Sequence, residues 1–569
     1  MFMSLTAYTR LFTSLRRAAA WFVALWLGVG LASPGIAGPG ALDPSFGSGG
    51  IVVTDFNGSI DDAAFAIAVQ PDGKILAAGY AFSFASNYDF ALVRYLPDGS
   101  LDAGFGMNGK VATDFHGSSD VAFAIALQPD GKIIAAGYAL RLDGPAFDFA
   151  LARYNADGSL DASFGVGGKV TTDFDRGWDQ AHALLLQPDG KIVVAGEAAI
   201  GGAATDFALA RYNADGSLDT SFGAAGKVTT RFAGGFDRAN TIVLQADGKI
   251  VAAGSATSRA TGPDFALVRY NADGSLDATF GIDGRVVTDF SAGGGIFANS
   301  DGASSAALQS DGKIVVAGAS THEPTFIDFV LARYNPDGSL DASFADGGKA
   351  ELSFFGNSSI DSISGVANQP DGKIVVAGIT TTATRDFALA RYNADGRLDL
   401  TFGVNGKVAT DLGNADNNAF AMALQPDGRI VIAGQAQPNS SSSNFALARY
   451  LNPEVITVAI DIKPGTTQNT INLGSGGNVP VAILSSDQFD ATAVDPQSVR
   501  LAGASIALKG KGTPAAFTDD VNGDGRLDLV VHIETEALQL SDSDTQAVLT
   551  ADTFDGRAIA GTDSVRIVR

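Results

Sequence analysis

Short hydrophobic runs separated by polar turns fill most of the chain. Within residues 179–230, the runs HALLLQ, KIVVAG and DFALARY each have the length of one strand, and SLDTSFGAAGKVTT supplies a fourth. The joins PDG and NADG are Asp-Gly turns of the kind that connect hairpin strands. This stretch shows no sustained helical periodicity. The pattern therefore predicts a small antiparallel sheet of four strands.

The same unit recurs about every 60 residues. Four-stranded sheets repeated in this way are typical of an all-β fold, the β-propeller, and we assign residues 42–452 to a seven-bladed β-propeller. The region opens with a fourth strand and stops near Tyr450 after a third. We expect the N-terminal strand to complete the last blade and lock the ring, which removes an unpaired edge. One marker of each repeat is a glutamine, at Gln70, Gln128, Gln187, Gln245, Gln309, Gln369 and Gln425.

One repeat reads LDASFGVGGKVTTDF, then ALLLQPDGKIVVAG, then DFALARYNADGS. This unit resembles the delta-60 repeat of bacterial secreted proteins, and the order of its turns is similar to that of NHL-type propeller blades. The resemblance covers about 410 residues. It implies a propeller fold and a bacterial source, and it implies little about a ligand.

The two faces of the expected ring differ in how much their turns vary. The PDG and NADG turns both lie on one face and are nearly the same in every repeat. The loops on the other face differ from blade to blade. Recognition on a repeat scaffold is expected where the repeats differ, so we expect any ligand to bind this variable face. Loops of the variable face include residues 80–88, 138–147, 197–205, 319–327 and 435–443.

An acidic residue stands eight positions before the marker glutamine in six repeats, and an asparagine in the seventh. We expect these residues where each innermost strand begins, around the mouth of the central channel. One interpretation is a ring of acids that attracts a cation or a basic ligand group. The other, which the asparagine favours, is that each side chain caps backbone N–H groups of its own turn. The positions are Asp62, Asp120, Asp179, Asp237, Asp301, Asp361 and Asn417.

Few residues suit catalysis. The chain has four histidines, and only His182 falls on an innermost strand. Asp179 and Trp178 stand close to it in sequence, so these three residues form the weak candidate for a catalytic site. A single imidazole at such a position is more often packed or hydrogen-bonded than a base.

Composition narrows the classes of partner and the compartment. The formal net charge of −24 makes nucleic acid and anionic lipid unfavourable partners. The sequence contains no cysteine, so disulfides and thiolate sites are excluded. The first part of residues 1–37 contains arginines and no acid, an apolar block follows it, and small residues come last. This is the order of a signal peptide. A retained membrane anchor is the alternative. We expect no membrane span after cleavage, and a location outside the bacterial cell or in its envelope.

Beyond the repeats, residues 456–569 alternate apolar strands with Gly-, Asp- and Ser-rich turns, which predicts a small β-sandwich-like module. The module contains the sequence DVNGDGRLD. Calcium takes oxygen ligands at alternate positions of a tight loop, and the ligand set would be Asp520, Asn522, Asp524, the carbonyl of Arg526 and Asp528. The position of the usual EF-hand glutamate is Val531. The loop instead resembles the calcium loops of FG-GAP and integrin-type hairpins. A hairpin turn without metal is the alternative.

These observations favour a non-enzymatic, exported and monomeric binding scaffold with structural Ca²⁺ in the C-terminal module. Its partner would be a protein, a glycan or a small molecule on the variable face. One alternative is a propeller hydrolase or lyase that works near His182. A second alternative is a structural or adhesive surface protein.

Overall fold

The computed structural model describes residues 38–568 apart from short gaps, and the expected signal peptide lies outside the described residues. No described helix is long and apolar enough to cross a membrane. The gaps are residues 57, 145, 203, 233–234, 259–261, 291–299, 322–326, 357–358, 382, 414–415, 440–441, 453–454, 467, 511, 542–543 and 555–556.

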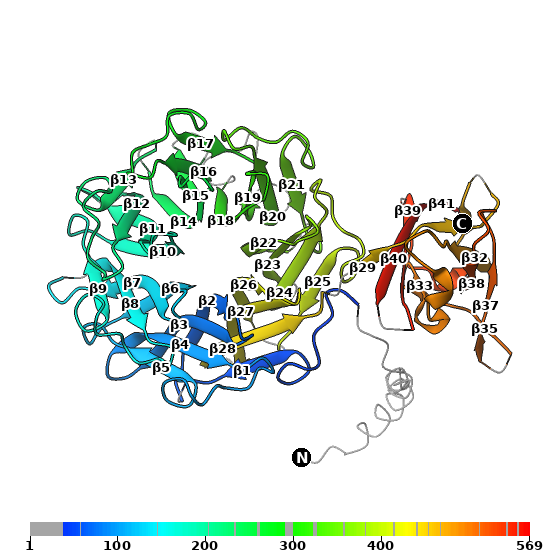
Figure 1. Ribbon diagram of the computed structural model, residues 1–569, viewed down its shortest axis with the longest axis horizontal. Coiled ribbons are helices and arrows are strands. Elements are labelled where there is room, and N and C mark those ends of the chain that lie inside the picture. Colours follow the sequence, from blue (N-terminus) through cyan, green and yellow to red (C-terminus); the bar gives the residue numbers. More distant parts are fainter. Residues whose placement is uncertain are drawn as a thin grey trace, which may run out of the picture.

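Seven four-stranded antiparallel sheets stand around a central axis as the blades of a propeller (Figure 1). In blades 1 to 6 the strands follow chain order from the centre outward, as the repeat predicts. Blade 1 is β2 (Asp62–Val69), β3 (Ile75–Ser83), β4 (Asn87–Tyr95) and β5 (Lys110–Thr113), and blade 2 is β6 (Asp120–Leu127), β7 (Ile133–Leu140), β8 (Phe147–Tyr154) and β9 (Lys169–Thr172). Blade 3 is β10 (Asp179–Leu186), β11 (Ile192–Ala199), β12 (Thr205–Tyr212) and β13 (Lys227–Thr230), and blade 4 is β14 (Asp237–Leu244), β15 (Ile250–Ser258), β16 (Gly262–Tyr270) and β17 (Arg285–Thr288). Blade 5 is β18 (Ser300–Leu308), β19 (Ile314–Thr321), β20 (Asp328–Tyr334) and β21 (Lys349–Leu352), and blade 6 is β22 (Ser362–Asn368), β23 (Ile374–Thr381), β24 (Arg385–Tyr392) and β25 (Lys407–Thr410).

The seventh blade combines the two ends of the repeat region. It consists of β26 (Asn417–Leu424), β27 (Ile430–Asn439), β28 (Ser442–Tyr450) and, as its outer strand, β1 (Ile51–Thr54). Strand β1 is antiparallel to β28, with Ile51 opposite Ala448 and Thr54 opposite Phe445. The expectation that the N-terminal strand closes the ring is confirmed. Strand β1 covers the edge of β28 that would otherwise be unpaired.

The hydrophobic cores lie between neighbouring blades. One cluster contains Phe90 and Leu92 of blade 1 together with Ile133 and Ala135 of blade 2, all with no exposed surface. Each blade therefore buries its apolar faces only against its neighbours. This is why a closed ring is stable where a single four-stranded sheet is not.

The glycine that ends KIVVAG is required by close backbone contact. A Cβ added to Gly196 would lie 1.9 Å from the carbonyl oxygen of Gln180 on the inner strand. The inner strand has a β-bulge there, between Ala181 and Ala183. The equivalent glycine of every other blade would place a Cβ 1.8 or 1.9 Å from a carbonyl oxygen, and these are Gly79, Gly137, Gly254, Gly318, Gly378 and Gly434.

The C-terminal module has two main sheets, in agreement with the expected β-sandwich. One has the order β29-β40-β39-β33-β34 and the other β30-β32-β38-β37. Side chains of both sheets, including Leu549 and Ile559 of the first and Val481 and Val531 of the second, form one core. The elements are β29 (Val455–Thr457), β30 (Ile460–Ile462), β31 (Thr470–Asn472), β32 (Asn478–Ile483), η1 (Ala491–Ala493), η2 (Pro496–Ser498), β33 (Arg500–Leu501), β34 (Ala504–Ser505), β35 (Leu508–Lys509), β36 (Thr513–Pro514), β37 (Ala516–Asp519), β38 (Asp528–Glu534), η3 (Thr535–Ala537), β39 (Gln546–Asp552), β40 (Ala558–Ser564) and β41 (Arg566–Val568).

Candidate functional site

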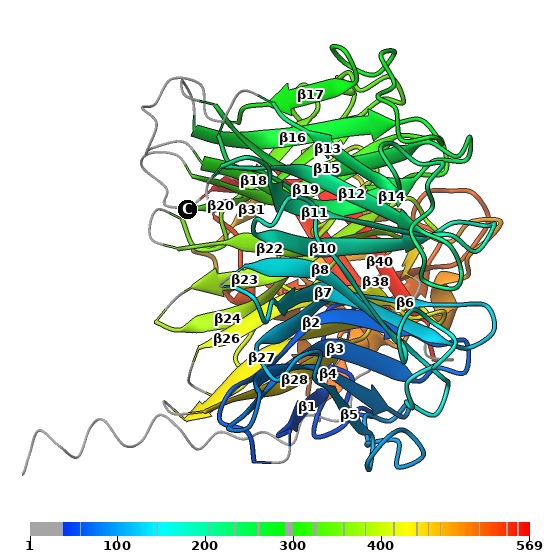
Figure 2. The same cartoon turned by 90° about the vertical axis from the view of Figure 1, so that its left-hand side faces the viewer.

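The strands run between the two faces of the ring (Figure 2). On the face of the Asp-Gly turns, charged residues pair with one another. In blade 2, Arg153 Nε donates to Asp161 Oδ2 at 2.8 Å, and Lys132 Nζ lies 3.0 Å from the same oxygen. The guanidinium also lies over the ring of Phe164, 4.6 Å from its centroid. Because Arg153 Nη1 donates to the carbonyl of Ala214 in the next blade, the pair joins two blades.

The arginine of the repeated DFALARY stretch has a buried acidic partner in all seven blades. The Nε–Oδ2 distances are 2.7 or 2.8 Å throughout. The pairs are Arg94–Asp102, Arg153–Asp161, Arg211–Asp219, Arg269–Asp277, Arg333–Asp341, Arg391–Asp399 and Arg449–Asp43.

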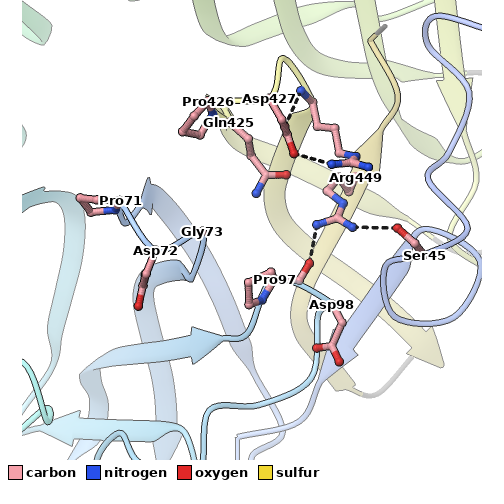
Figure 3. A pocket seen from close by; sticks show the side chains of 11 residues that line it. Ser45, Pro71, Asp72, Gly73, Pro97, Asp98, Gln425, Pro426, Asp427 and Arg449 are labelled. Atoms are coloured by element: carbon pink, nitrogen blue, oxygen red, sulfur yellow. Dashed lines mark hydrogen bonds and ion pairs between the residues drawn. The ribbon is translucent and has the colours of Figure 1, made fainter.

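A hollow of about 530 Å³ opens on this face where blades 7 and 1 meet (Figure 3). Its lining comes from the turns at residues 71–73, 97–98 and 425–427, together with Arg449. The guanidinium of Arg449 donates to Ser45 Oγ at 3.2 Å and to the carbonyl of Pro97 (Figure 3). The guanidinium of Arg449 is therefore used by the joint between blades 7 and 1.

The variable face presents large hydrophobic side chains to solvent. Phe84, Phe236 and Trp178 are 90%, 61% and 55% exposed. Two of these rings pack edge to face against a second ring. The centroid of Phe84 lies 5.2 Å from that of Phe82, and the centroid of Trp178 lies 5.4 Å from that of Phe147. Supported aromatic side chains on a surface are typical of recognition sites.

Asp61 ties blades 1 and 7 together on the variable face. Its carboxylate accepts hydrogen bonds from the hydroxyls of Tyr80 and Tyr88, each at 3.1 Å, and from Ser443 Oγ at 2.5 Å. Burial, followed by the charge of Asp61, raises the pKa of Tyr80 beyond its usual range. The two tyrosines are therefore fixed hydroxyl donors.

Half-buried side chains at the inner-strand bulges line the centre of the ring. The ring centroid of Phe65 lies 5.0 Å from that of Phe123 and 4.7 Å from that of Phe420. The centroids of Phe123 and His182 are 5.1 Å apart. On the polar half, Asn240 Nδ2 donates to the carbonyl of Ala303 at 2.7 Å. The centre thus has an aromatic side over blades 7, 1 and 2 and a polar side beyond His182.

Glu197 is the acidic partner of His182, and the sequence analysis missed it. His182 Nε2 lies 3.5 Å from Glu197 Oε1, and Thr205 Oγ1 donates to Glu197 Oε2 at 2.7 Å. Burial lowers the pKa of His182, so the imidazole is neutral near pH 7. The available signal was the position of Glu197 next to Gly196, where the aligned residues of blades 1 and 2 are Tyr80 and Tyr138.

The other two catalytic candidates have contacts of their own. Asp179 is fully buried, and its Oδ2 accepts from the N–H of Phe174 at 2.7 Å. Trp178 packs on Phe147 at the surface. The group that meets His182 is therefore Glu197 on the adjacent strand.

The inner-strand aspartates are buried between neighbouring blades. Each of the six accepts a backbone N–H with one carboxylate oxygen, as the capping interpretation expects; for example, Asp120 Oδ2 accepts from Phe115 at 2.6 Å. All six are at most 1% exposed, and Asn417 is 1% exposed, so their side chains do not form an open channel mouth. Burial, with the charges of Asp114 and Asp89, raises the pKa of Asp120 to about 7.

The proposed calcium loop folds as a tight, exposed turn between β37 and β38. Asp520 Oδ1 accepts the N–H groups of Gly523 and Asp524 at 2.9 and 3.1 Å, and its Oδ2 accepts that of Gly525 at 2.9 Å. Gly525 has φ of 86°, the conformation that favours glycine.

The other two carboxylates of the loop are engaged by the protein itself. Asp528 is fully buried and accepts from Ser485 and Val521 N–H groups at 2.7 and 3.0 Å. Asp524 forms an ion pair with Arg526 at 3.3 Å. Asp520, Asp524 and Asp528 are not among the described groups of three acids whose ligand oxygens lie within 4.8 Å of one another, so the loop as folded does not gather these carboxylates around one point.

Comparison with known proteins supports the fold. Seven stretches match the family model described as "Domain of unknown function (DUF5122) beta-propeller", so the chain is a β-propeller repeat protein. No curated protein matches the sequence. The matched stretches are residues 70–105, 128–164, 187–222, 245–280, 309–344, 369–402 and 425–452.

Solved structures with a similar arrangement include proteins of different activities. A protein of unknown function from Dyadobacter fermentans is 12% identical over 72% of this chain and 99% of its own, with a TM-score of 0.36. The β-propeller domain of a protease from Pyrococcus furiosus is 10% identical over 68% and 96%, with a TM-score of 0.35. A gluconolactonase from Xanthomonas campestris is 13% identical over 56% and 90%, with a TM-score of 0.28. Likenesses at this level carry no argument about activity.

Proposed function

We propose that this β-propeller repeat protein is an exported, non-enzymatic binding protein of a bacterium that takes its ligand on the variable face. The observation that carries the proposal is the group of exposed aromatic side chains on that face, Phe84, Trp178 and Phe236. The ring contacts beneath Phe84 and Trp178 fix two of them in place. A fixed aromatic side chain loses little conformational entropy on binding, so it suits recognition of a protein, a glycan or a small molecule.

The opposite face supports this assignment by contrast. Its charged groups pair with one another across the blade junctions. The net charge of −24 disfavours nucleic acid as the partner. The delta-60 resemblance and residues 1–37 support secretion or a place in the cell envelope, with the protein acting as a monomer.

A glycan and small-molecule array probed with the full chain tests the binding proposal. For a ligand found there, we expect Trp178→Ala and Phe84→Ala each to weaken binding at least about tenfold in calorimetry. Val166→Ala is the matched control, because Val166 is 86% exposed in a loop of the opposite face. Ligands that lose affinity only with Val166→Ala would place recognition on the wrong face and contradict the proposal.

We also propose that Asp520, Asn522, Asp524, Arg526 and Asp528 hold a structural Ca²⁺ in the C-terminal module, in a loop similar to those of FG-GAP hairpins. Calcium should raise the melting temperature of this module in calorimetry, and Asp524→Ala should remove the rise. Glu536→Ala, which changes an exposed carboxylate outside the loop, should keep it. An equal response to calcium in both variants would contradict the calcium site and favour the alternative, a hairpin turn without metal.

The alternative function is a hydrolase or lyase at the centre of the ring, and the contact of His182 with Glu197 favours it. Turnover of any ligand that His182→Ala abolishes while binding persists would establish the enzyme and contradict the non-enzymatic assignment. A chain that binds nothing on the arrays would instead favour the second alternative, a structural or adhesive surface protein.

A further inference from the structure

Three aspartates from two neighbouring blades meet at the junction of blades 1 and 2. Asp89 lies on β4, Asp114 follows β5, and Asp120 begins β6. One ligand oxygen from each lies within 4.8 Å of the other two. Strand pairing places Asp89 opposite Ala81 on β3, so the cluster lies at the end of the strands that borders the variable face.

Two of the three carboxylates are buried and incompletely satisfied. Asp89 is 7% exposed and Asp120 is fully buried. Their Oδ2 atoms accept from Ser86 Oγ at 2.7 Å and from the N–H of Phe115 at 2.6 Å. Their Oδ1 atoms have no hydrogen-bond partner among the described residues. Buried acceptors are normally paired, and leaving one unpaired is costly, so the site lacks a partner for these oxygens.

Nearby cations of the protein do not supply that partner. The ammonium of Lys169 donates to the main-chain carbonyl of Asp114 at 2.9 Å and lies over the ring of Phe115, 5.5 Å from its centroid. Within the described part of the chain, Lys169 forms no ion pair with any of the three carboxylates. Among the described residues, three acidic side chains therefore converge without an ion-pair partner.

We propose that Asp89, Asp114 and Asp120 bind a calcium ion between blades 1 and 2. Calcium is a hard cation that takes carboxylate and water oxygens at about 2.3–2.6 Å, so oxygens that share it lie up to about 5 Å apart. The spacing of this cluster meets that condition. The exposed carboxylate of Asp114 leaves the site open to solvent, which supplies the remaining ligands.

The other junctions indicate that the three acids are not needed to build a blade. Between blades 3 and 4 the middle position is Arg231, which pairs with Asp206 at 2.9 Å, so the chain supplies its own cation. Between blades 7 and 1 the outer position is Asn444, beside Asp55 and Asp62. Both junctions keep the cap in which the inner aspartate accepts a phenylalanine N–H. Capping therefore requires only the inner aspartate.

Two further junctions have the complete set of acids. Asp148, Asp173 and Asp179 form the second, and there Arg141 lies 2.9 Å from Asp173 and 3.5 Å from Asp148. Asp264, Asp289 and Asp301 form the third. The proposal is made for the first junction, where no arginine competes.

The test measures bound calcium in the full chain carrying Asp524→Ala, so that the C-terminal loop does not contribute. Asp114→Asn is the test variant and Asp55→Asn is its matched control. Both residues follow an outer strand and accept the N–H of the glycine three positions later, so both variants weaken the same kind of turn.

We expect Asp114→Asn to reduce the calcium stoichiometry in calorimetry by one ion per chain and to diminish the calcium-dependent rise in melting temperature. Asp55→Asn should leave both unchanged. Asn444→Asp, which completes the set at the last junction, should add one ion. Equal stoichiometry in Asp114→Asn and Asp55→Asn, with both less stable in EDTA and in calcium alike, would reduce Asp114 to a turn residue and overturn the proposal. Because the loop is disabled throughout, failure of the C-terminal calcium site does not affect this result.

Discussion

Single side chains connect the blades at positions that recur around the ring. In six blades the buried tyrosine of the Arg-Tyr pair donates its hydroxyl to a threonine on the outer strand of the preceding blade, at 2.8–3.0 Å. Blade 6 is the exception. Its partner position is Leu352, and the hydroxyl of Tyr392 has no hydrogen-bond partner among the described residues. The chain thus contains its own control for the contribution of one hydrogen bond.

We expect Tyr334→Phe to lower the free energy of unfolding by about 1 kcal/mol, since it removes the hydrogen bond to Thr288 and leaves that threonine unpaired. Tyr392→Phe should be neutral or slightly stabilising, because the hydroxyl that it removes is already unpaired. Urea denaturation of the two variants measures the difference. Equal losses would show that the tyrosine contributes through packing alone.

The repeated aspartate of the arginine joint makes stability depend on acid. The hydrogen bond from Ser163 chiefly, helped by Lys132 and Arg153 and opposed by burial, holds the pKa of Asp161 well below its usual range. A depressed folded-state pKa stabilises the fold above the unfolded pKa, near 3.9, and this stability is lost as the pH falls through the folded value.

Asp161→Asn should therefore lower the melting temperature at pH 7 and make it less sensitive to acid between about pH 4 and pH 2. Asp130→Asn, a change to an exposed aspartate of the same blade, is the control and should keep the acid sensitivity of the parent. Parallel acid profiles for all three proteins would contradict a role for this ion pair.

Sequence alone predicted some of these residues and missed others for a physical reason. In six blades the repeated arginine and its acidic partner lie eight residues apart in the sequence, so their pairing can be inferred locally. Asp89 and Asp114 meet Asp120 only after three strands of two blades are placed side by side. Glu197 reaches His182 across a strand pair whose register shifts at a bulge. The bulge is marked in the sequence only by the glycine that it requires on the second strand, and this glycine does not tell which inner-strand side chain meets Glu197.

At the scale of the strand, the bulge of the inner strand explains why each repeated KIVVAG stretch ends in glycine. The bulge brings a carbonyl of the inner strand against the second strand, where only glycine fits. The residue at the bulge then points toward the centre of the ring, as Phe123 and His182 do. The glycine that looks like part of a loop is therefore a requirement of the channel lining.

We expect Gly196→Ala to destabilise blade 3 by about 3 kcal/mol, because the new methyl group meets a backbone carbonyl that cannot move alone. Gly202→Ala in the same blade is the control, since an added Cβ there has nothing within 4 Å. Thermal denaturation followed by circular dichroism compares them. A Gly196→Ala protein as stable as the control would show that the bulge relaxes freely.

At the scale of the whole molecule, the ring was predictable because seven similar repeats each encode a four-stranded sheet. The N-terminal strand also supplies the fourth strand that the last repeat lacks. The strand order of the C-terminal module was not predictable. Its first strand, β29, pairs in parallel with β40, about a hundred residues later. Single long-range pairings leave no periodic signal in the sequence.

Deleting residues 38–56 should lower the melting temperature and cause self-association, because it exposes the edge of β28 and removes Asp43 from Arg449. Adding a synthetic peptide of residues 42–56 should restore the monomer in size-exclusion chromatography. A deletion variant as stable and monomeric as the parent would mean that the outer strand of blade 7 is dispensable.

The closing strand also sets how the ring responds to a pulling force. The chain enters and leaves the propeller at one point, where Leu42 bridges Tyr450, Gly40 N–H donates to the carbonyl of Leu451 at 2.7 Å, and Leu451 N–H donates to that of Ala41 at 2.8 Å. Because β1 and β28 are antiparallel, tension between the two ends loads these hydrogen bonds one after another rather than together. We therefore expect the hydrogen bonds of this seam to break in sequence under tension, so that blade 7 opens before the blades whose four strands are consecutive in the chain.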